Sequence, residues 1–435
     1  MIPWRKNLLE RIYRDPVHNI IRLNANTSDE RLLIRLIDTA EFQRLRRVRQ
    51  LGLAAFAYQG AEHSRFSHSL GVLHLTTRIL EKFNRKYQIS DFDSVTIRAA
   101  ALLHDVGHGA FSHVMESVLK FHHEDFTVQA VLSDATEIGQ VLRSFSNELP
   151  ERVAAVISGE FEPVALAQIV SSQLDADRMD YLLRDSLMTG AKYGIFDLEW
   201  ILKTLEIDRE RDQIYVSAHG LFAVEDYLQA RYYMFRQVYF HRTLRSAEVV
   251  LRALLNRALE LFAAGETVWC APGTAFEKIL RREKLNLQQH LELDDTDIVF
   301  HIKQWQRSSD PILADLSRRF INRQLFKALE LDMPDDERAD FLERGREIVT
   351  RAGFPAQFYF VEDRAGDVPY FPSTSPKAKP RSAIYVEDGF SRPVIREISE
   401  VSAAMRGLLT GFTAHRVCFP LELFDEINRI YRISK

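Results

Sequence analysis

Apolar residues in the first fifty positions follow two different rhythms. Residues 11–24 alternate between apolar and polar side chains around Pro16, which is the pattern of a short β-hairpin. In residues 29–50 the apolar side chains recur at intervals of three and four, the spacing of one helix face. Asp38 and Thr39 interrupt this pattern and suit the start of a new helix. We therefore expect a hairpin followed by two consecutive helices.

Helical patterns dominate the rest of the chain. Before residue 265 we expect helices at about 70–87, 134–168, 174–185, 197–205 and 225–262, the last of them long or kinked. A further helix would end at residue 103, and another would begin at residue 122. One short strand is expected at 213–218. After a change in composition at 265–273 we expect helices at 274–282, 285–292, 310–329, 334–353 and 421–433, with strands near 357–362, 383–387 and 416–419. The chain is thus predicted to be mainly α. A helical core with an N-terminal β-hairpin would occupy residues 1–265, and a smaller α+β domain residues 266–435.

Composition and charge are those of an ordinary globular protein. The 435 residues are 46% hydrophobic and 27% charged, and the net charge of −4 gives no indication of binding to nucleic acid or to an anionic membrane. No apolar run reaches the roughly 18 residues of a membrane span, and we expect no signal peptide. Cys270 and Cys418 lack metal-ligand spacing and fit a reducing compartment, so we expect a cytoplasmic protein.

The densest chemistry lies in residues 101–113, Ala-Leu-Leu-His-Asp-Val-Gly-His-Gly-Ala-Phe-Ser-His. An apolar helix ends there in His104 and Asp105, whose side chains would be buried and must find partners. Imidazole and carboxylate together suit a divalent Fe, Mn, Co or Zn ion, and carboxylate with water suits Mg. Gly107 and Gly109 would end the helix and let the backbone approach a ligand. The alternative is an ordinary capped His–Asp pair.

Histidines cluster around this stretch, because eight of the 14 in the chain lie between residues 63 and 123. His68 precedes an apolar helical face, and Arg65 beside it suits phosphate oxygens. Asp177, Tyr181 and Asp185 are spaced four residues apart and share one helix face. That face could equally be the solvent side of its helix. The histidine clusters favour a site.

His68, His104-Asp105 and Asp177 form the ordered pattern H…HD…D on three predicted helices. This pattern resembles the HD-domain phosphohydrolase superfamily, and further motifs resemble its deoxynucleoside triphosphate (dNTP) triphosphohydrolases. The motifs are RDPVH at 14–18, DTAEFQRLRR at 38–47, QLG at 50–52, GAEHSRFSHSLGV at 60–72, HDVGHGAFSH at 104–113 and DADRMDYLLRD at 175–185. The resemblance covers about residues 11–250 and is weak beyond 270.

The resemblance implies a site around one divalent metal ion, with Mg, Mn, Fe, Co or Zn all open. The implied metal ligands are His68, His104, Asp105 and Asp177. The implied catalytic residues, which contact the triphosphate or transfer protons, are His108, His113 and His123, with Glu116 orienting His113. The implied substrate-binding residues are Arg65, Arg178 and Arg231 for phosphate and Gln50, Leu51, Tyr181, Asp185 and Tyr239 for a deoxyribose without a 2′-hydroxyl. The relatives considered have lysine where this chain has Arg178, and both residues supply a cation.

The same resemblance implies regulation. Asp38, Gln43 and Arg46 match positions that recognise an activating guanine nucleotide in regulated relatives, so a dNTP or GTP activator and a homodimer or homotetramer are expected partners. Gln43 and Arg46 could instead only brace the hairpin. The predicted reaction is hydrolysis of a dNTP to a deoxynucleoside and inorganic triphosphate. The alternatives are an HD phosphohydrolase acting on another nucleotide or on a single-stranded DNA end, and a catalytically silent module that senses nucleotides or binds nucleic acid.

Overall fold

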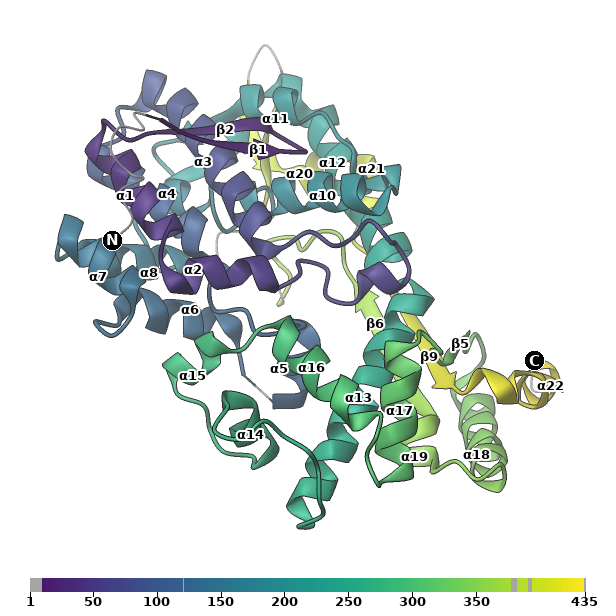
Figure 1. The fold of residues 1–435 in the computed structure, drawn as a ribbon. Helices are drawn as coiled ribbons and strands as arrows, with labels where there is room; N and C mark the ends of the chain where they lie inside the picture. Colours follow the sequence, from purple (N-terminus) through teal and green to yellow (C-terminus); the bar gives the residue numbers. More distant parts are fainter. Residues whose placement is uncertain (1–9, 120, 377–381, 390–392, 434–435) are drawn as a thin grey trace.

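The computed structural model of the chain describes residues 10–119, 121–376, 382–389 and 393–433, without the side chains of His113 and Ile433. Two bodies are joined by a long helix (Figure 1). The upper body in that view contains the N-terminal hairpin and most of the helices up to residue 234, and the lower body contains the helix at 113–119, the helices between residues 275 and 359 and a small sheet. The prediction of a mainly α fold is confirmed. None of the described helices has the length and apolar character needed to cross a membrane.

The first fifty residues form the hairpin and the two helices that the spacing of their apolar residues predicts. Strands β1 (Glu10–Asp15) and β2 (Asn19–Asn24) pair antiparallel, with Asp15 opposite Asn19 at the turn. Helices α1 (Ser28–Ile37) and α2 (Ala40–Arg44) follow. Thr39 caps α2 by accepting a hydrogen bond from the amide of Phe42, as the interruption of the helical pattern indicates.

The next helices along the chain position the site. They are α3 (Arg65–Tyr87), α4 (Asp91–Leu103), α5 (His113–Leu119), α6 (His123–Leu132), α7 (Glu137–Phe145), α8 (Leu149–Ser158), α9 (Val164–Ala167), α10 (Ala176–Thr189) and α11 (Leu198–Thr204). All of them except α5 lie in the upper body, whereas α5 packs against the long helix that joins the two bodies. Helix α3 packs against both α4 and α10. A side chain at Gly71 would collide with Asp180 and Arg184 of α10. Glycine at this position therefore allows the close approach of α3 and α10.

The region predicted as a long or kinked helix is a kinked pair. Helix α12 (Leu221–Met234) leads into a π-helical turn at Phe235–Tyr239, and α13 (Arg242–Ala263) continues into the lower body (Figure 1). π-Helical turns are frequent at functional sites. This one contains Tyr239, which lines the cavity described below.

The lower body differs from the prediction in several places. Its helices are α14 (Ala275–Leu280), α15 (Leu287–Glu292), α16 (Asp295–Trp305), α17 (Pro311–Ile321), α18 (Asp335–Arg351), α19 (Ala356–Tyr359) and α22 (Phe424–Ile433). Helix α16 was not expected. The helix expected over 310–329 ends at Ile321, and β5 (Lys327–Glu330) follows it. The strand expected near 357–362 is instead β6 (Val361–Asp367), and β9 (Phe412–Phe419) lies between β5 and β6.

The last quarter of the chain returns to the upper body. Strands β7 (Tyr385–Asp388) and β8 (Val394–Glu397) join β3 (Leu205–Asp208) and β4 (Gln213–Val216) in one sheet of order β3-β4-β7-β8. Helices α20 (Ile398–Val401) and α21 (Ala403–Leu408) follow. Tyr370, Val386 and Met405 are buried in the same core as the helices of the upper body. Residues on both sides of the expected 265/266 boundary thus share a core, and the division into domains there stays a prediction.

Candidate active site

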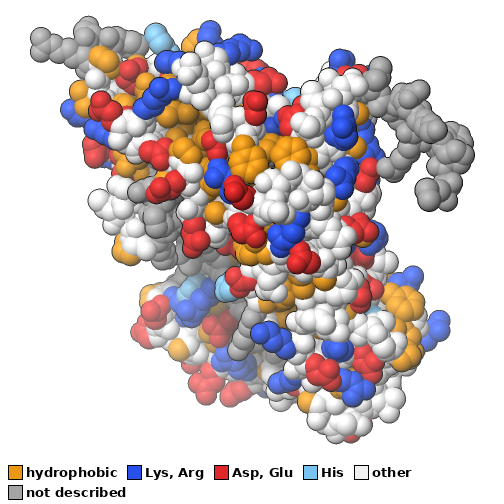
Figure 2. All heavy atoms as spheres, turned by 90° about the vertical axis from the view of Figure 1, so that its left-hand side faces the viewer, with side chains coloured by type: hydrophobic (Ala, Val, Ile, Leu, Met, Phe, Trp, Pro, Cys, Tyr) orange, Lys and Arg blue, Asp and Glu red, His pale blue; other side chains and the backbone are white. Residues whose placement is uncertain are grey.

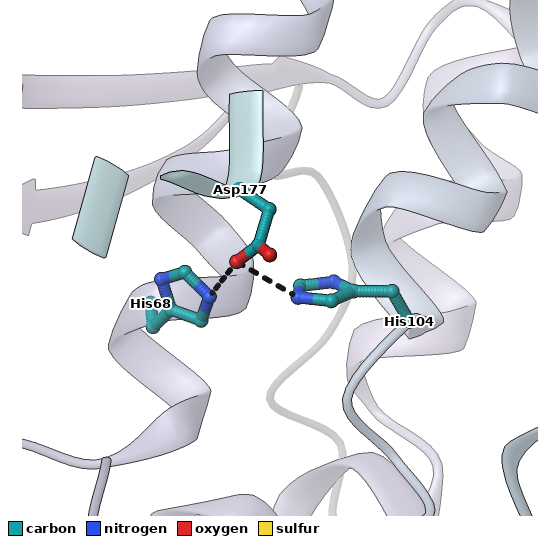
Figure 3. Close-up of side chains that lie close together, drawn as sticks. All are labelled: His68, His104 and Asp177. Carbon is teal, nitrogen blue, oxygen red and sulfur yellow. Dashed lines mark hydrogen bonds and ion pairs between the residues drawn. The ribbon is translucent and has the colours of Figure 1, made fainter. Parts of the chain in front are cut away.

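Three helices bring two imidazoles and a carboxylate together. His68 from the first turn of α3, His104 at the end of α4 and Asp177 from the first turn of α10 point toward one another (Figure 3). Oδ1 of Asp177 lies 2.9 Å from Nε2 of His68 and 3.6 Å from Nε2 of His104. One ligand atom of each residue lies within 4.8 Å of the other two, which is close enough for one metal ion.

The nitrogen atoms that face the centre of this cluster are suited to bind a divalent metal ion. Nδ1 of His104 is 2.9 Å from the carbonyl oxygen of Ala101 and must donate to it, so Nε2 carries a lone pair when the ring is neutral. This Nε2 is buried, makes no hydrogen bond and faces carboxylate oxygens. His68 faces a carboxylate at both nitrogens. Burial would lower its pKa, but hydrogen bonds to Asp177 and Asp180 raise it to about 10. A divalent ion bound to both Nε2 atoms would replace that proton.

Asp105 lies beside this cluster and pairs with Arg65. Its Oδ1 is 3.4 Å from Nε2 of His104, and its Oδ2 accepts a 2.5 Å hydrogen bond from Arg65. Burial opposes ionisation, but the charges of Arg65, His104 and His108 outweigh it and hold the pKa of Asp105 well below its usual range. Asp105 is therefore an anionic group within reach of the same ion.

Asp180, which the sequence analysis did not single out, orients His68. Its Oδ2 lies 2.8 Å from Nδ1 of His68, its Oδ1 lies 2.7 Å from Nε2 of His18, and Arg184 donates to both oxygens. Burial would raise the pKa of Asp180, but the charge of Arg184 and these hydrogen bonds hold it well below its usual range. A carboxylate behind a ligating histidine fixes the ring and its tautomer. The motif at 14–18 thus supports the candidate metal-binding cluster through His18 and through Asp15, which pairs with Arg184.

A second group of candidate residues lies next to the first. The rings of His108 and His123 stack with centroids 3.6 Å apart, and Nδ1 of His123 is 2.7 Å from Oε1 of Glu116. Burial and the neighbouring charge of Arg65 hold the pKa of His108 well below its usual range. Glu116, expected to orient His113, is hydrogen-bonded to His123. The His113 side chain lies outside the described residues, so its predicted role stays a prediction.

A cavity of about 630 Å³ joins these groups. Of the predicted site residues it is lined by Gln50, Leu51, Arg65, His104, Asp105, His108, His123, Asp177, Arg178, Tyr181, Asp185 and Tyr239. In the surface view, histidine side chains are visible where the two bodies meet, and acidic and basic side chains are interspersed (Figure 2). A larger hollow of about 780 Å³ lies between the start of α13 and the end of α17, but no histidine is among the described residues that line it.

Further hydrogen-bonding groups line the same cavity. The hydroxyl of Tyr239 donates to Oδ2 of Asp185, and Oδ1 of Asp185 is 2.7 Å from Nε2 of His63. The rings of Tyr181 and Tyr239 meet edge to face, with centroids 6.3 Å apart. Oε1 of Gln50 is buried and accepts no hydrogen bond. A hydroxyl group of a ligand would satisfy this acceptor.

Two residues, Arg231 and Gly107, have other contacts than the sequence led us to expect. Arg231, expected to contact phosphate, does not line the cavity. It donates to the carbonyl oxygens of Val368 and Pro369 and pairs with Asp367 at 3.0 Å. A side chain at Gly107 would meet the backbone of α6, so this glycine permits packing of the turn on that helix rather than the expected approach to a ligand.

The predicted regulatory residues lie outside the cavity lining. Asp38 pairs with Arg11 of β1 at 2.8 Å and so braces the hairpin. Oε1 of Gln43 accepts from Nε of Arg46, and the Arg46 guanidinium lies 3.5 Å from the centre of the Phe66 ring. Asp38 therefore braces the hairpin, whereas Gln43 and Arg46 contact each other.

Comparison with known proteins gives a consistent picture. The HD domain model matches residues 65–185. The uncharacterised protein YwfO of Bacillus subtilis is 40% identical over 95% of this chain and 93% of its own length. A phosphohydrolase from Bacteroides thetaiotaomicron has a similar structure, with a TM-score of 0.81 and 28% identity over 94% of this chain and 99% of that chain.

Relatives with a named activity cover less of the chain. The deoxynucleoside triphosphate triphosphohydrolase SAMHD1 of Gallus gallus is 28% identical over 57% of this chain and 45% of its own length. The homologue from Dictyostelium discoideum is 29% identical over 51% of this chain and 45% of its own length. The match to the HD domain model, the cluster of His68, His104 and Asp177 that could hold a metal ion, and the match to YwfO over 95% of this chain all support the same family. The chain therefore belongs to the HD-domain family of metal-dependent phosphohydrolases that resemble the dNTP triphosphohydrolases.

Proposed function

We propose that this protein hydrolyses deoxynucleoside triphosphates to a deoxynucleoside and inorganic triphosphate. The observation that supports this most is the sugar end of the cavity, where Tyr239 donates to an Asp185 carboxylate that also contacts His63. Asp185 and the unsatisfied Oε1 of Gln50 are acceptors suited to a 3′-hydroxyl, and the rings of Tyr181 and Tyr239 beside them would exclude a 2′-hydroxyl. The names of the SAMHD1 relatives support the same substrate class.

The chemistry needs positive charge at the phosphates and a proton for the leaving group. A divalent ion held by His68, His104, Asp105 and Asp177, with Mg, Mn, Fe, Co and Zn as candidates, would neutralise phosphate oxygens and polarise water. Arg65 and Arg178 line the cavity and supply further positive charge. Water attacks the α-phosphorus, the bond from phosphorus to the 5′-oxygen breaks, and that oxygen takes a proton. We assign the proton transfer to His113 or to the stacked pair His108 and His123.

Product analysis tests this proposal. The four dNTPs and the four ribonucleotides are incubated singly with Mg²⁺ or Mn²⁺, and the products are separated by chromatography. His104→Ala protein purified in the same way controls for contaminating phosphatases. Deoxynucleoside with inorganic triphosphate supports the proposal. Monophosphate with pyrophosphate would keep the phosphohydrolase and overturn the reaction, and no product from any nucleotide would favour a different phosphorylated substrate or a silent binding module.

We further propose that Asp38, Gln43 and Arg46 form part of a site for an activating dNTP or GTP in a homodimer or homotetramer. Their position outside the cavity lining supports a separate site. Rates for each dNTP with and without GTP, together with the molar mass in solution under both conditions, test this. An Arg46→Ala variant that loses activation by GTP but retains the unactivated rate would support the assignment.

A further inference from the structure

The backbone that follows the HD motif contains an unusual turn. Phe111 and Ser112 have φ angles of +45° and +38°, in the left-handed region that residues other than glycine rarely adopt. Two such residues in succession persist only where neighbouring groups fix them. The turn separates His108 from α5 and lines the cavity through both residues.

Asp295, the first residue of α16, fixes this turn from the lower body. Its Oδ1 accepts a 2.8 Å hydrogen bond from the amide of Phe111, and its Oδ2 accepts a 3.0 Å hydrogen bond from the amide of Arg49. The side chain is buried, so water does not replace either bond. One carboxylate therefore joins two backbone segments that are 62 residues apart, at Arg49 and Phe111.

Both of these segments position Arg65, one through its backbone and the other through its side chain. Arg49 forms a β-bridge with Ser64, and the amide of Arg65 donates to the carbonyl oxygen of Val48 at 2.9 Å. From the other side, the hydroxyl of Ser112 accepts from Nε and from the terminal nitrogen of Arg65, at 3.2 and 2.9 Å. The backbone of Arg65 is thus placed by one segment that Asp295 holds, and its guanidinium is placed by the other segment together with Asp105.

We propose that Asp295 is a positioning residue that aims the Arg65 guanidinium at a triphosphate bound in the cavity. The proposal rests on the proposed function in one respect, that Arg65 binds phosphate. Asp295 is not among the described residues that line the cavity, and it would act through the amides of Arg49 and Phe111. Because Asp295 lies in the lower body and Arg65 in the upper one, the lower body is required for an ordered phosphate site.

Neighbouring residues brace the same stretch of backbone. Nε2 of His290 donates to the carbonyl oxygen of Gly107 at 2.7 Å. The buried guanidinium of Arg44 donates to the carbonyl oxygens of Leu293, Val106 and His108. These bonds fix the backbone before Gly109. Among the described side chains, it is Asp295 that accepts a hydrogen bond from the segment with positive φ angles, at the amide of Phe111. Removal of Asp295 should therefore disturb Arg65 more than His104 or His108.

The test is binding of inorganic triphosphate and of a deoxynucleoside, measured by calorimetry in the presence of Mn²⁺. Asparagine at position 295 can accept from one amide only and presents an N–H to the other. For Asp295→Asn we expect triphosphate affinity to fall about tenfold, the effect of misaligning one charge-assisted contact, with deoxynucleoside affinity and metal content unchanged. Asp297→Asn is the matched control, since Asp297 caps the same helix by accepting from the amide of Asp294 and contacts neither segment. It should bind triphosphate like the wild type.

Two more variants secure the test against a folding defect. Asp295→Glu keeps both acceptor oxygens and should recover part of the lost affinity. Ser112→Ala leaves the Asp295 bonds intact and removes only the hydroxyl that Arg65 contacts, so it should weaken triphosphate alone. Equal loss of triphosphate and deoxynucleoside binding in Asp295→Asn, or unchanged triphosphate binding in Ser112→Ala, would overturn the proposal.

The outcome is separable from that of the proposed function. Selective loss of triphosphate binding in Asp295→Asn and in Arg65→Ala, from a protein that hydrolyses no dNTP, would support the positioning role and reject the dNTP substrate. Suppose instead that the wild-type protein hydrolyses dNTPs and that its Asp295→Asn and Asp297→Asn variants bind triphosphate equally well. That result would support the dNTP substrate and reject the positioning role of Asp295.

Discussion

The hydroxyl of Tyr239 donates a hydrogen bond of 2.8 Å to Oδ2 of Asp185. Tyr239 lies in the π-helical turn between α12 and α13, and Asp185 lies in α10. Burial and the neighbouring carboxylate of Asp185 raise the pKa of Tyr239 well above its usual value, so the hydroxyl keeps its proton and remains a donor. The pair therefore forms a fixed part of the cavity lining.

Replacing Tyr239 with alanine should widen the proposed sugar end of the cavity and admit a 2′-hydroxyl. We expect the ratio of dNTP to ribonucleotide kcat/KM to fall by about tenfold or more, in the range that a lost steric contact gives. Tyr233→Ala is the control, because Tyr233 is exposed on α12 and does not line the cavity. A ratio unchanged in Tyr239→Ala would remove Tyr239 from the sugar pocket.

Removal of one metal ligand should abolish metal binding without unfolding the protein. In His104→Ala, Asp177 and His68 keep their mutual contact, and α4 loses no hydrogen bond between backbone groups. We expect metal content near zero by elemental analysis, turnover reduced by at least about a hundredfold, and an unchanged helical signal in circular dichroism. His122→Ala, at an exposed histidine next to His123, should keep its metal. Full activity in His104→Ala would contradict the site.

Asp180 should control metal affinity without binding the ion. Asparagine at this position keeps the shape of the side chain but removes the charge that fixes Nδ1 of His68. Loss of such a partner typically weakens metal binding by about 10- to 100-fold, and we expect that loss in competition with a chelating dye. Asp197→Asn, which removes a capping carboxylate from the start of α11, should leave metal affinity intact. Because Arg184 also loses a charged partner, affinities are compared only for protein that circular dichroism reports as folded.

Much of the cavity lining could be predicted because its residues lie in short motifs with helical spacing. His104 and Asp105 end an apolar helix, and Asp177, Tyr181 and Asp185 repeat at four-residue intervals, so local sequence indicates both the chemistry and the face. Asp180 lies on the same helix but was missed. Arg184 is its neighbour four residues along the same helix, but His68 and His18 are brought to it by tertiary packing, which no local pattern reports.

The lower body was predicted less well, and α16 is the clearest case. Asp294 and Asp297 form a capping box, and Ile298, Ile302 and Trp305 follow at helical spacing. That signal is in the sequence, but an acidic run between two helices also fits a loop. The role of Asp295 could not be predicted from the same run, because its two partners lie at positions 49 and 111. The helix expected over 310–329 fails for a related reason, since residues 327–330 pair with β9.

A final prediction concerns pH. His290 is buried and donates to the carbonyl oxygen of Gly107, and burial together with the charge of Arg44 lowers its pKa to about 4. An unfolded chain has an ordinary histidine pKa near 6.5 and binds more protons than the folded one between these values, so stability must fall as the pH drops through this window. The expected loss from this residue is about 2 kcal/mol between pH 7.5 and pH 5. Chemical denaturation at both pH values, with a chelator present so that metal release makes no contribution, measures it.

The matched variant for this measurement is His290→Gln, whose amide can still donate to Gly107 but does not titrate. Its stability should decline less than that of the wild type over the same pH interval, by about the same 2 kcal/mol. Other histidines and carboxylates titrate in both proteins, and their contributions cancel in the difference. Equal pH dependence of the two proteins would show that His290 is as easily protonated in the folded chain as in the unfolded one. The brace at Gly107 would then persist in acid, and any loss of activity there would have to arise at the metal centre itself.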